Sequence, residues 1–294
     1  MPDDNKKKKW VGVAFLLATT VGWGLNWPGI KLLLRELPPL FSRGVAGYAA
    51  VALLAGIALW RGERLSLPPG GLPRMMFAAL TNVVGWMGMT LLAMQWLSVA
   101  EGALLIYTMP IWAMLLAWPI LGERPTLRGL VALILGLAGL SILFGGRGLA
   151  LDANKIAGIA LALAAAGLFG LGTVINRKPL PVPPFASVMW QVGLGCVPLI
   201  LFGLLFENLD FGKATLTGWS VLAYMTLVPM SLCYLTWFAA LRYLPASTAA
   251  TGMLLTPLIG IVAGAFVLGE PLGWPEAAAI VVTLGGVTLA LRQA

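Results

Sequence analysis

The sequence contains no histidine, only two cysteines and few charged residues. Of its 294 residues, 10% are Asp, Glu, Lys or Arg, whereas a soluble domain carries about 25%. Cys196 and Cys233 both fall within long apolar runs, where a free thiol behaves as a small apolar residue. Without histidine and without a cysteine pair in a loop, the chain offers no zinc-like ligand spacing. We therefore expect no metal, no cofactor and no enzyme activity.

Long uncharged runs take the place of the missing charges. Ten windows of 15 or more residues contain no Asp, Glu, Lys or Arg: 10–30, 44–60, 75–100, 102–122, 129–146, 156–176, 179–206, 214–241, 243–269 and 277–291. A helix that spans a membrane needs about 17–25 apolar residues, and a backbone in lipid must satisfy its own hydrogen bonds. The sequence therefore predicts an all-α membrane protein with ten transmembrane helices, which contacts membrane lipid.

The positive charges are distributed unevenly between the predicted loops. With ten spans, the side that holds both termini carries 13 of the 19 Lys and Arg residues, the opposite side carries 5, and Arg43 lies within a predicted helix. The positive-inside rule then places both termini in the cytoplasm, with residues 1–9 as a basic cytoplasmic tail. The net charge of +8 is thus explained by topology, and we expect no nucleic-acid partner.

Two membrane-length stretches match each other at an offset of 147 residues, which is half of the chain. They run from Leu97 to Glu123 and from Leu244 to Glu270. Each follows an aromatic residue, contains a proline within its apolar run (Pro110 and Pro257) and ends on Leu-Gly-Glu. Such a match in register indicates an internal duplication. We expect a first five-helix repeat over residues 10–146 and a second over residues 147–294.

An odd number of helices in each repeat has a geometrical consequence. The second repeat enters the membrane from the opposite side, so the two repeats form an inverted pair. Many secondary transporters are built in this way, with the substrate site midway through the membrane between the repeats. The sequence therefore favours a secondary transporter that works by alternating access. The alternative is a duplicated structural bundle without a passage.

The chain resembles the drug/metabolite transporter superfamily, and within it the EamA-type ten-helix exporters. The residues that carry this resemblance include Trp23-Gly24-x-Asn26 and Lys31 in the first predicted helix and Arg43 in the second. The aromatic-Leu pairs at Trp96 and Tyr243 and the paired Leu-Gly-Glu endings add to it. The resemblance implies a bacterial inner-membrane protein whose site is walled by the first, third, fourth, sixth, eighth and ninth predicted helices. The Trp-rich, acid-poor interior looks most like the aromatic amino-acid exporters of the YddG type.

Ionisable residues at membrane depth are candidates for function because they are costly there. Arg43 lies near one end of the second predicted helix and can reach toward the interface. We interpret it as having a structural role or contacting a lipid headgroup, with substrate contact as the alternative. Glu101 is interpreted as an N-terminal helix cap, with a gate or an ammonium contact as the alternative. No carboxylate lies in residues 10–30, whereas the small multidrug relatives in the superfamily are known for one in their first helix. A proton-coupled multidrug or cation antiporter is therefore the second hypothesis for function.

Polar and aromatic side chains inside the predicted helices are the candidate substrate-binding residues. Asn82 and Trp86 lie four residues apart, hence on one helix face, and an unsatisfied amide in lipid would be costly. The prolines each free a carbonyl group four residues upstream, at Ile106 and Met253, and a packing kink is the alternative. The predicted site comprises Asn26, Asn82, Trp86, Tyr107, Pro110, Tyr224, Ser231, Tyr234, Thr256 and Pro257.

Such a site would be largely apolar, aromatic and uncharged. Aromatic faces hold an ammonium group by cation–π attraction and an aromatic side chain by stacking. Phosphorylated substrates would need buried Lys or Arg clamps, which we do not expect here. The predicted function is export of small hydrophobic or aromatic solutes, aromatic amino acids first, by a protein that acts as a monomer.

Overall fold

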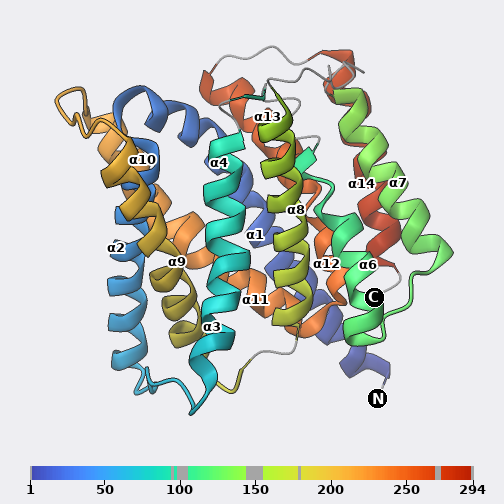
Figure 1. Cartoon of the computed structure of the whole chain (residues 1–294). Coiled ribbons are helices and arrows are strands. Elements are labelled where there is room, and N and C mark those ends of the chain that lie inside the picture. Colours follow the sequence, from blue (N-terminus) through green and yellow to red (C-terminus); the bar gives the residue numbers. More distant parts are fainter. Residues whose placement is uncertain are drawn as a thin grey trace.

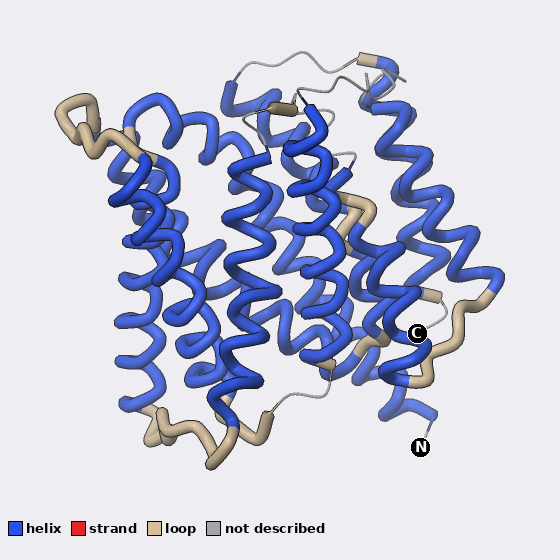
Figure 2. The backbone as a smooth tube through the Cα atoms, in the orientation of Figure 1, coloured by secondary structure: helices blue, strands red, loops and turns tan. Residues whose placement is uncertain are grey.

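The computed structural model describes residues 2–93, 96–97, 105–143, 155–177, 180–268 and 273–292. Within these ranges every regular element is a helix, as Figure 2 shows. The predicted all-α class is therefore confirmed.

The helices follow one another in two groups. The first group is α1 (Pro2–Glu36), α2 (Pro39–Trp60), α3 (Gly71–Ala79), the π-helix η1 (Leu80–Met89), α4 (Thr90–Ala93), α6 (Met109–Leu121) and α7 (Leu127–Leu143). The second group is α8 (Ile156–Asn176), α9 (Pro184–Phe206), α10 (Leu216–Leu227), the π-helix η3 (Val228–Leu232), α11 (Cys233–Tyr243), α12 (Ala246–Gly252), α13 (Leu255–Leu268) and α14 (Trp274–Leu291). Because α3, η1 and α4 directly follow one another, as do α10, η3 and α11, each set forms one long rod.

Seven of the described helical stretches are long and apolar enough to cross a membrane. They are Lys7–Ile30, Pro39–Trp60, Gly71–Ala93, Ile156–Asn176, Pro184–Phe206, Leu216–Tyr243 and Ala246–Val267. Three shorter apolar helices, Met109–Leu121, Leu127–Gly139 and Ile280–Leu289, coincide with the other three uncharged windows. The predicted window 102–122 begins among residues that lie outside the described ranges. The protein is thus a multi-pass membrane protein, and its outward-facing side chains include many large apolar ones, such as Phe206 and Phe266.

Proline and glycine define several of the helix ends. α2 and α9 begin on Pro39 and Pro184, each preceded by another proline; the first turn of a helix tolerates proline because its N–H groups have no partner within the helix. α6 ends at Gly122, whose φ of 77° lies in the left-handed region that favours glycine. The Leu-Gly-Glu ending of the first stretch therefore coincides with a real helix boundary.

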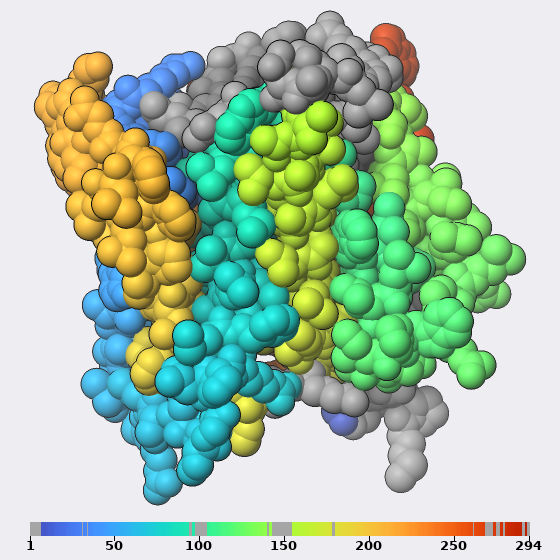
Figure 3. All heavy atoms as spheres, in the orientation of Figure 1, coloured from blue at the N-terminus to red at the C-terminus, as the bar shows by residue number. Residues whose placement is uncertain are grey.

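The helices pack in pairs across the molecule (Figure 1). α2 packs along α9 at one side of the view, and α7 packs along α14 at the other. Between these pairs, α1 packs against α11 and α13, while α8 packs against η1 and α6. Both chain termini lie in the lower half of Figure 1. Figure 3 shows the face on which α10, α3, α8, α6 and α7 stand side by side. The largest cluster of buried apolar side chains in the described part of the chain extends from α2 and α9 through the central helices to Val287 on α14.

Candidate functional site

A cavity lies between the central helices of both groups. It contains about 1150 Å³ of empty space, counting the part that is continuous with solvent. Its aromatic wall is formed by Trp23, Trp27, Trp86, Tyr107 and Tyr234. Its methionines are Met87, Met225, Met230 and Met253, and its polar residues are Asn26, Arg43, Thr90 and Thr256. A largely apolar lining with a few polar side chains is the usual character of a small-molecule site in a protein.

Half of the predicted site residues lie on this cavity. They are Asn26, Trp86, Tyr107, Tyr234 and Thr256. They come from α1, η1, the turn before α6, α11 and α13, so side chains far apart in the sequence converge on one space. Their role in binding a substrate remains a prediction.

Asn82 does not line the cavity, although it is fully buried. Its side-chain amide donates a 3.1 Å hydrogen bond to Gln191 Oε1 on α9. Gln191 in turn donates to Asn176 Oδ1 at 3.5 Å, and the Asn176 amide donates to the Gly172 carbonyl oxygen at 2.8 Å. The predicted pairing of Asn82 with Trp86 at the cavity is therefore wrong, because the amide of Asn82 is engaged in a network that joins η1, α9 and α8.

Tyr224 and Ser231 also lie away from the cavity lining. The Tyr224 hydroxyl donates a 2.9 Å hydrogen bond to the carbonyl oxygen of Gly22, which ties α10 to α1. The Ser231 hydroxyl donates at 2.7 Å to the carbonyl oxygen of Thr226. Spacings of 7 and 3 residues would put Tyr224, Ser231 and Tyr234 on one face of a regular α-helix. The π-helix η3 changes the direction of the side chains along this rod, and of the three only Tyr234 lines the cavity.

The two prolines act at helix starts and do not line the cavity. Pro110 is the second residue of α6 and Pro257 the third of α13, where a missing N–H costs little. The carbonyl oxygen of Met253, which we expected to be free, accepts a 2.9 Å hydrogen bond from the Thr256 N–H. The helices break just before both prolines, and the breaks place Tyr107 and Met253 on the cavity wall.

Arg43 is the principal correction to the predicted site. Its side chain is buried, with 8% of the residue exposed, and it lines the cavity instead of reaching toward a lipid headgroup. We predicted an uncharged cavity, but the guanidinium of Arg43 places a positive charge on its wall. No described carboxylate lies within salt-bridge distance of the guanidinium. Glu101, the other ionisable residue we considered, lies outside the described ranges.

Four buried polar atoms on the cavity wall have no hydrogen-bond partner among the described residues. They are Asn26 Oδ1, Thr90 Oγ1, Tyr107 OH and Thr256 Oγ1. The indole of Trp27 lies beside Tyr107, with ring centroids 6.4 Å apart, but no hydrogen bond between them meets normal geometry. These four atoms are therefore the polar groups of the cavity wall that are available to a solute or to water.

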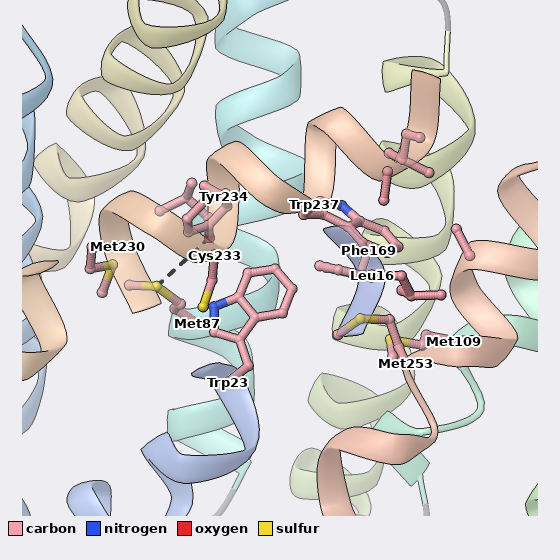
Figure 4. Close-up of a cluster of buried hydrophobic side chains, with 14 of the residues drawn as sticks. Leu16, Trp23, Met87, Met109, Phe169, Met230, Cys233, Tyr234, Trp237 and Met253 are labelled. Carbon is pink, nitrogen blue, oxygen red and sulfur yellow. Dashed lines mark hydrogen bonds between the residues drawn. The ribbon is translucent and has the colours of Figure 1, made fainter. Parts of the chain in front are cut away.

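The rings of Trp23, Phe169, Tyr234 and Trp237 gather in one buried cluster (Figure 4), and two of them, Trp23 and Tyr234, line the cavity. The ring of Trp23 lies 5.5 Å from that of Tyr234 and 6.3 Å from that of Trp237, and Trp237 stacks on Phe169 at 5.7 Å. Trp23 Nε1 donates a 3.1 Å hydrogen bond to the carbonyl oxygen of Pro229. Within α1 the lining begins at Trp23. The cluster therefore separates the cavity from the half of the bundle that holds the start of α1.

Several cavity residues were absent from the predicted set. Trp23 and Trp27 lie four residues apart on α1, and the spacing argument applied to Asn82 and Trp86 would have found them. The four methionines gave no signal, because methionine in an apolar helix is as common in packing as in a binding surface.

Carboxylates fasten helix ends at the periphery of the bundle. Glu207 accepts hydrogen bonds from the main-chain N–H groups of Leu40 (2.8 Å) and Phe41 (2.9 Å) at the start of α2. Glu123, at the end of α6, lies 3.9 Å from Arg177 at the end of α8, so this contact joins the ends of two helices. Burial raises the pKa of the Glu123 carboxyl, and the nearby Arg177 opposes this shift. Glu270, which ends the second of the two matching stretches, lies outside the described ranges.

A bundle of apolar helices around a cavity with aromatic and polar walls is an arrangement typical of membrane transporters. The family model of the EamA-like transporters matches the chain twice, over residues 10–145 and 156–292. The chain therefore belongs to the EamA-like transporter family, and it is not an enzyme.

Curated relatives and a solved structure agree with this family. The "Uncharacterized transporter YvbV" of Bacillus subtilis is 30% identical over 265 residues, which cover 88% of this chain and 85% of that protein. A "Probable amino-acid metabolite efflux pump" of Salmonella typhimurium is 27% identical and covers 92% of this chain and 91% of its own. A crystal structure with 18% sequence identity superposes with a TM-score of 0.83 over 98% of both chains, which supports the fold alone.

Proposed function

We propose that this protein is a secondary transporter that exports small hydrophobic or aromatic solutes, aromatic amino acids first, by alternating access. The observation that carries this proposal is the cavity wall, where five aromatic residues surround the same space as four unpartnered polar atoms. Aromatic rings bind an aromatic body by stacking or edge contacts, and the polar atoms are placed to satisfy its polar groups. The efflux pump of Salmonella typhimurium supports amino acids as the first solutes to test.

We also propose that ten spans form two inverted repeats, over residues 10–146 and 147–294. Positions 147 apart meet in the interior: the Tyr234 hydroxyl lies 4.0 Å from Met87 Sδ, and the Thr283 hydroxyl lies 3.4 Å from the Gly136 carbonyl oxygen. Equivalent positions meet where they lie close to a two-fold axis. The two family matches support the duplication, and the opposite directions of α1 and α8 in Figure 1 support the inversion.

The two π-helices support the same relationship. Shifted back by 147 residues, η3 (Val228–Leu232) falls on residues 81–85, inside η1 (Leu80–Met89). The helix breaks before α6 and α13 correspond in the same way. Discontinuous helices near the repeat interface are typical of transporter sites. In this proposal both termini lie on the cytoplasmic side of a bacterial inner membrane, and the cavity is displaced toward the opposite, outer side of that membrane. Since the cavity is built within one chain, we propose that a monomer suffices.

The second hypothesis, a proton-coupled multidrug or cation antiporter, requires a carboxylate or histidine on the path. The lining residues that the structure describes include no acidic side chain and one arginine. Gradient-driven export is therefore the function that we propose.

Proteoliposomes containing the purified protein test this function. Vesicles preloaded with unlabelled phenylalanine, tryptophan or leucine should accumulate the labelled amino acid by counterflow, with and without a pH gradient. Protein-free vesicles and vesicles loaded with a phosphorylated sugar are the controls. Counterflow that disappears without a pH gradient would favour the antiporter, and no counterflow of any apolar solute would contradict the proposal.

A further inference from the structure

Arg43 lies on α2 in an environment that lacks a counter-charge. The residue is 8% exposed and lines the cavity together with Asn26, Tyr107 and Tyr234. An isolated buried cation is costly unless an anion accompanies it. Nothing in the described part of the chain places a carboxylate against it.

The carboxylates near the start of α2 and the end of α1 are already engaged elsewhere. Glu207 accepts hydrogen bonds from the main chain of Leu40 and Phe41, one turn before Arg43. Glu36 accepts hydrogen bonds from the N–H and hydroxyl of Thr215, at 2.9 and 2.8 Å. The helix ends thus use the available carboxylates, and the guanidinium is left to face the cavity.

The remaining polar atoms of the cavity complement this cation. Asn26 Oδ1 is a hydrogen-bond acceptor without a partner, and the hydroxyl oxygens of Thr90, Tyr107 and Thr256 are also unpartnered. The cavity wall therefore offers two kinds of polar group. The guanidinium of Arg43 is positively charged, and the four neutral oxygen atoms can accept hydrogen bonds from an ammonium group. Between and around them lie the aromatic rings.

We propose that Arg43 binds the carboxylate of the transported solute. The substrate class is then a monocarboxylate with an aromatic or large apolar body, with α-amino acids as zwitterionic members whose ammonium group meets the neutral oxygens. This inference rests on the proposed export function and adds the charge requirement. A guanidinium suits this role because its planar fork forms two parallel hydrogen bonds to a carboxylate. Simple organic cations are disfavoured, since the same charge repels them.

Three ligands that differ in one charged group test the inference. Phenylalanine carries both groups, 3-phenylpropionate only the carboxylate and phenethylamine only the ammonium group. Their dissociation constants would be measured by isothermal titration calorimetry with the full-length protein in lipid nanodiscs at neutral pH. The variants are Arg43→Gln, which removes the charge, and Arg43→Lys, which keeps it without the fork. Arg35→Gln, at an exposed position outside the cavity lining, is the matched control.

The wild type should bind phenylalanine and 3-phenylpropionate, and phenethylamine at least about tenfold more weakly. Arg43→Gln should weaken the two carboxylates by about 10- to 100-fold and leave phenethylamine unchanged or tighter. Arg43→Lys should fall between, and Arg35→Gln should match the wild type. Melting temperature and gel filtration would report whether each variant is folded. If Arg43→Gln does not fold, the comparison of the three ligands on the wild type still tests the carboxylate requirement.

The outcomes separate the two proposals. Wild-type binding of phenethylamine as tight as that of 3-phenylpropionate would overturn the carboxylate site and leave export of aromatic solutes standing. A uniform loss of all three ligands in a folded Arg43→Gln variant would also overturn it, because it indicates a structural role. Binding of none of the three by the wild type would overturn the proposed function together with the inference.

Discussion

The hydroxyl of Tyr234 donates a 2.8 Å hydrogen bond to the main-chain carbonyl oxygen of Asn82. The two residues lie 152 positions apart and belong to the two halves of the chain. The bond attaches α11, with its aromatic cluster, to the π-helix η1, whose Asn82 side chain enters the network with Gln191 and Asn176. This one hydrogen bond thus links Tyr234 on the cavity wall to the buried polar network of Asn82, Gln191 and Asn176.

Removal of this hydroxyl tests the link. Tyr234→Phe keeps the ring but removes the hydroxyl that donates to the carbonyl oxygen of Asn82. We expect the free energy of unfolding to fall by about 1 kcal/mol. The exposed Tyr48 provides the control, because Tyr48→Phe removes a hydroxyl from the outer face of α2. Thermal unfolding of the purified variants, followed by retention on gel filtration after heating, measures the difference. Equal melting curves for both variants would contradict the prediction.

The helices were predictable because the physical signal lies in single segments. A run without charge, such as 156–176, must be helical in lipid, and α8 begins at Ile156 and ends at Asn176. The membrane imposes this constraint on each segment by itself, so no knowledge of packing is needed. Helix ends at Pro39, Pro184 and Gly122 were recognisable for a similar local reason.

The cavity was only partly predictable because it depends on which helices meet. Asn82 and Trp86 share a face of one rod, yet α9 engages the first with Gln191 and the second reaches the cavity. From the sequence, Arg43 was expected near a membrane interface. In the structure Glu207 binds the main chain at the start of α2, and Arg43 lines the cavity. Neither distinction exists in the sequence of a single helix, since both depend on a second helix more than 100 positions away.

Gly172 provides a test of the polar network. A Cβ atom at this position would collide with Asn82 Oδ1, so Gly172→Ala must displace the buried amide. We expect a loss of about 1–3 kcal/mol. Gly56→Ala is the matched control, because nothing lies within 4 Å of a Cβ built on Gly56, and alanine favours a helix over glycine by about 0.5–1 kcal/mol. Opposite shifts in melting temperature are expected, and a stable Gly172→Ala protein would contradict the close contact.

Trp86 tests the aromatic wall. Trp86→Ala removes a ring that lies 4.6 Å from that of Phe169 and lines the cavity. The apparent KM for aromatic solutes should rise by about 5- to 50-fold, with a smaller effect on leucine. Trp60→Ala, at a residue that is 87% exposed, should leave transport unchanged. Transport of every solute at wild-type rates by Trp86→Ala would exclude Trp86 from the site.

The hydrogen bonds of the Glu36 carboxylate should make the stability of the protein depend on pH. The N–H and hydroxyl of Thr215 lower the pKa of its carboxyl below the usual 4.5, with a further contribution from Gly218 N–H. Because the pKa is lower in the folded protein, the stabilising contribution is fully present above pH 4.5 and is lost as the pH falls through the folded-state value. Glu36→Gln should therefore melt below the wild type at neutral pH and converge with it in acid. Asp210→Asn controls for a charge change in the neighbouring loop, and a gap that persists in acid would contradict the assignment.

The contact between Glu123 and Arg177 predicts how the closed end of the bundle opens. Glu123 joins the end of α6 to the end of α8 and faces the main-chain N–H groups of Ala246 and Ser247 at the start of α12. The aromatic cluster lies between this end and the cavity, so alternating access requires the contact to break. Because the pair is partly exposed, its loss is worth about 1 kcal/mol at most.

Cysteine labelling measures this opening. Thr251 is 2% exposed and lines a second pocket beside Glu123, so Thr251→Cys in a background without Cys196 and Cys233 should react slowly with a water-soluble maleimide. Adding Glu123→Gln should raise the labelling rate by up to about fivefold, because it shifts the population toward the state open at this end. Glu207→Gln removes a carboxylate from the opposite end of the bundle and should not raise the rate. Equal labelling in all three proteins would show that this contact does not hold the end closed, and would leave the aromatic cluster as the barrier to test next.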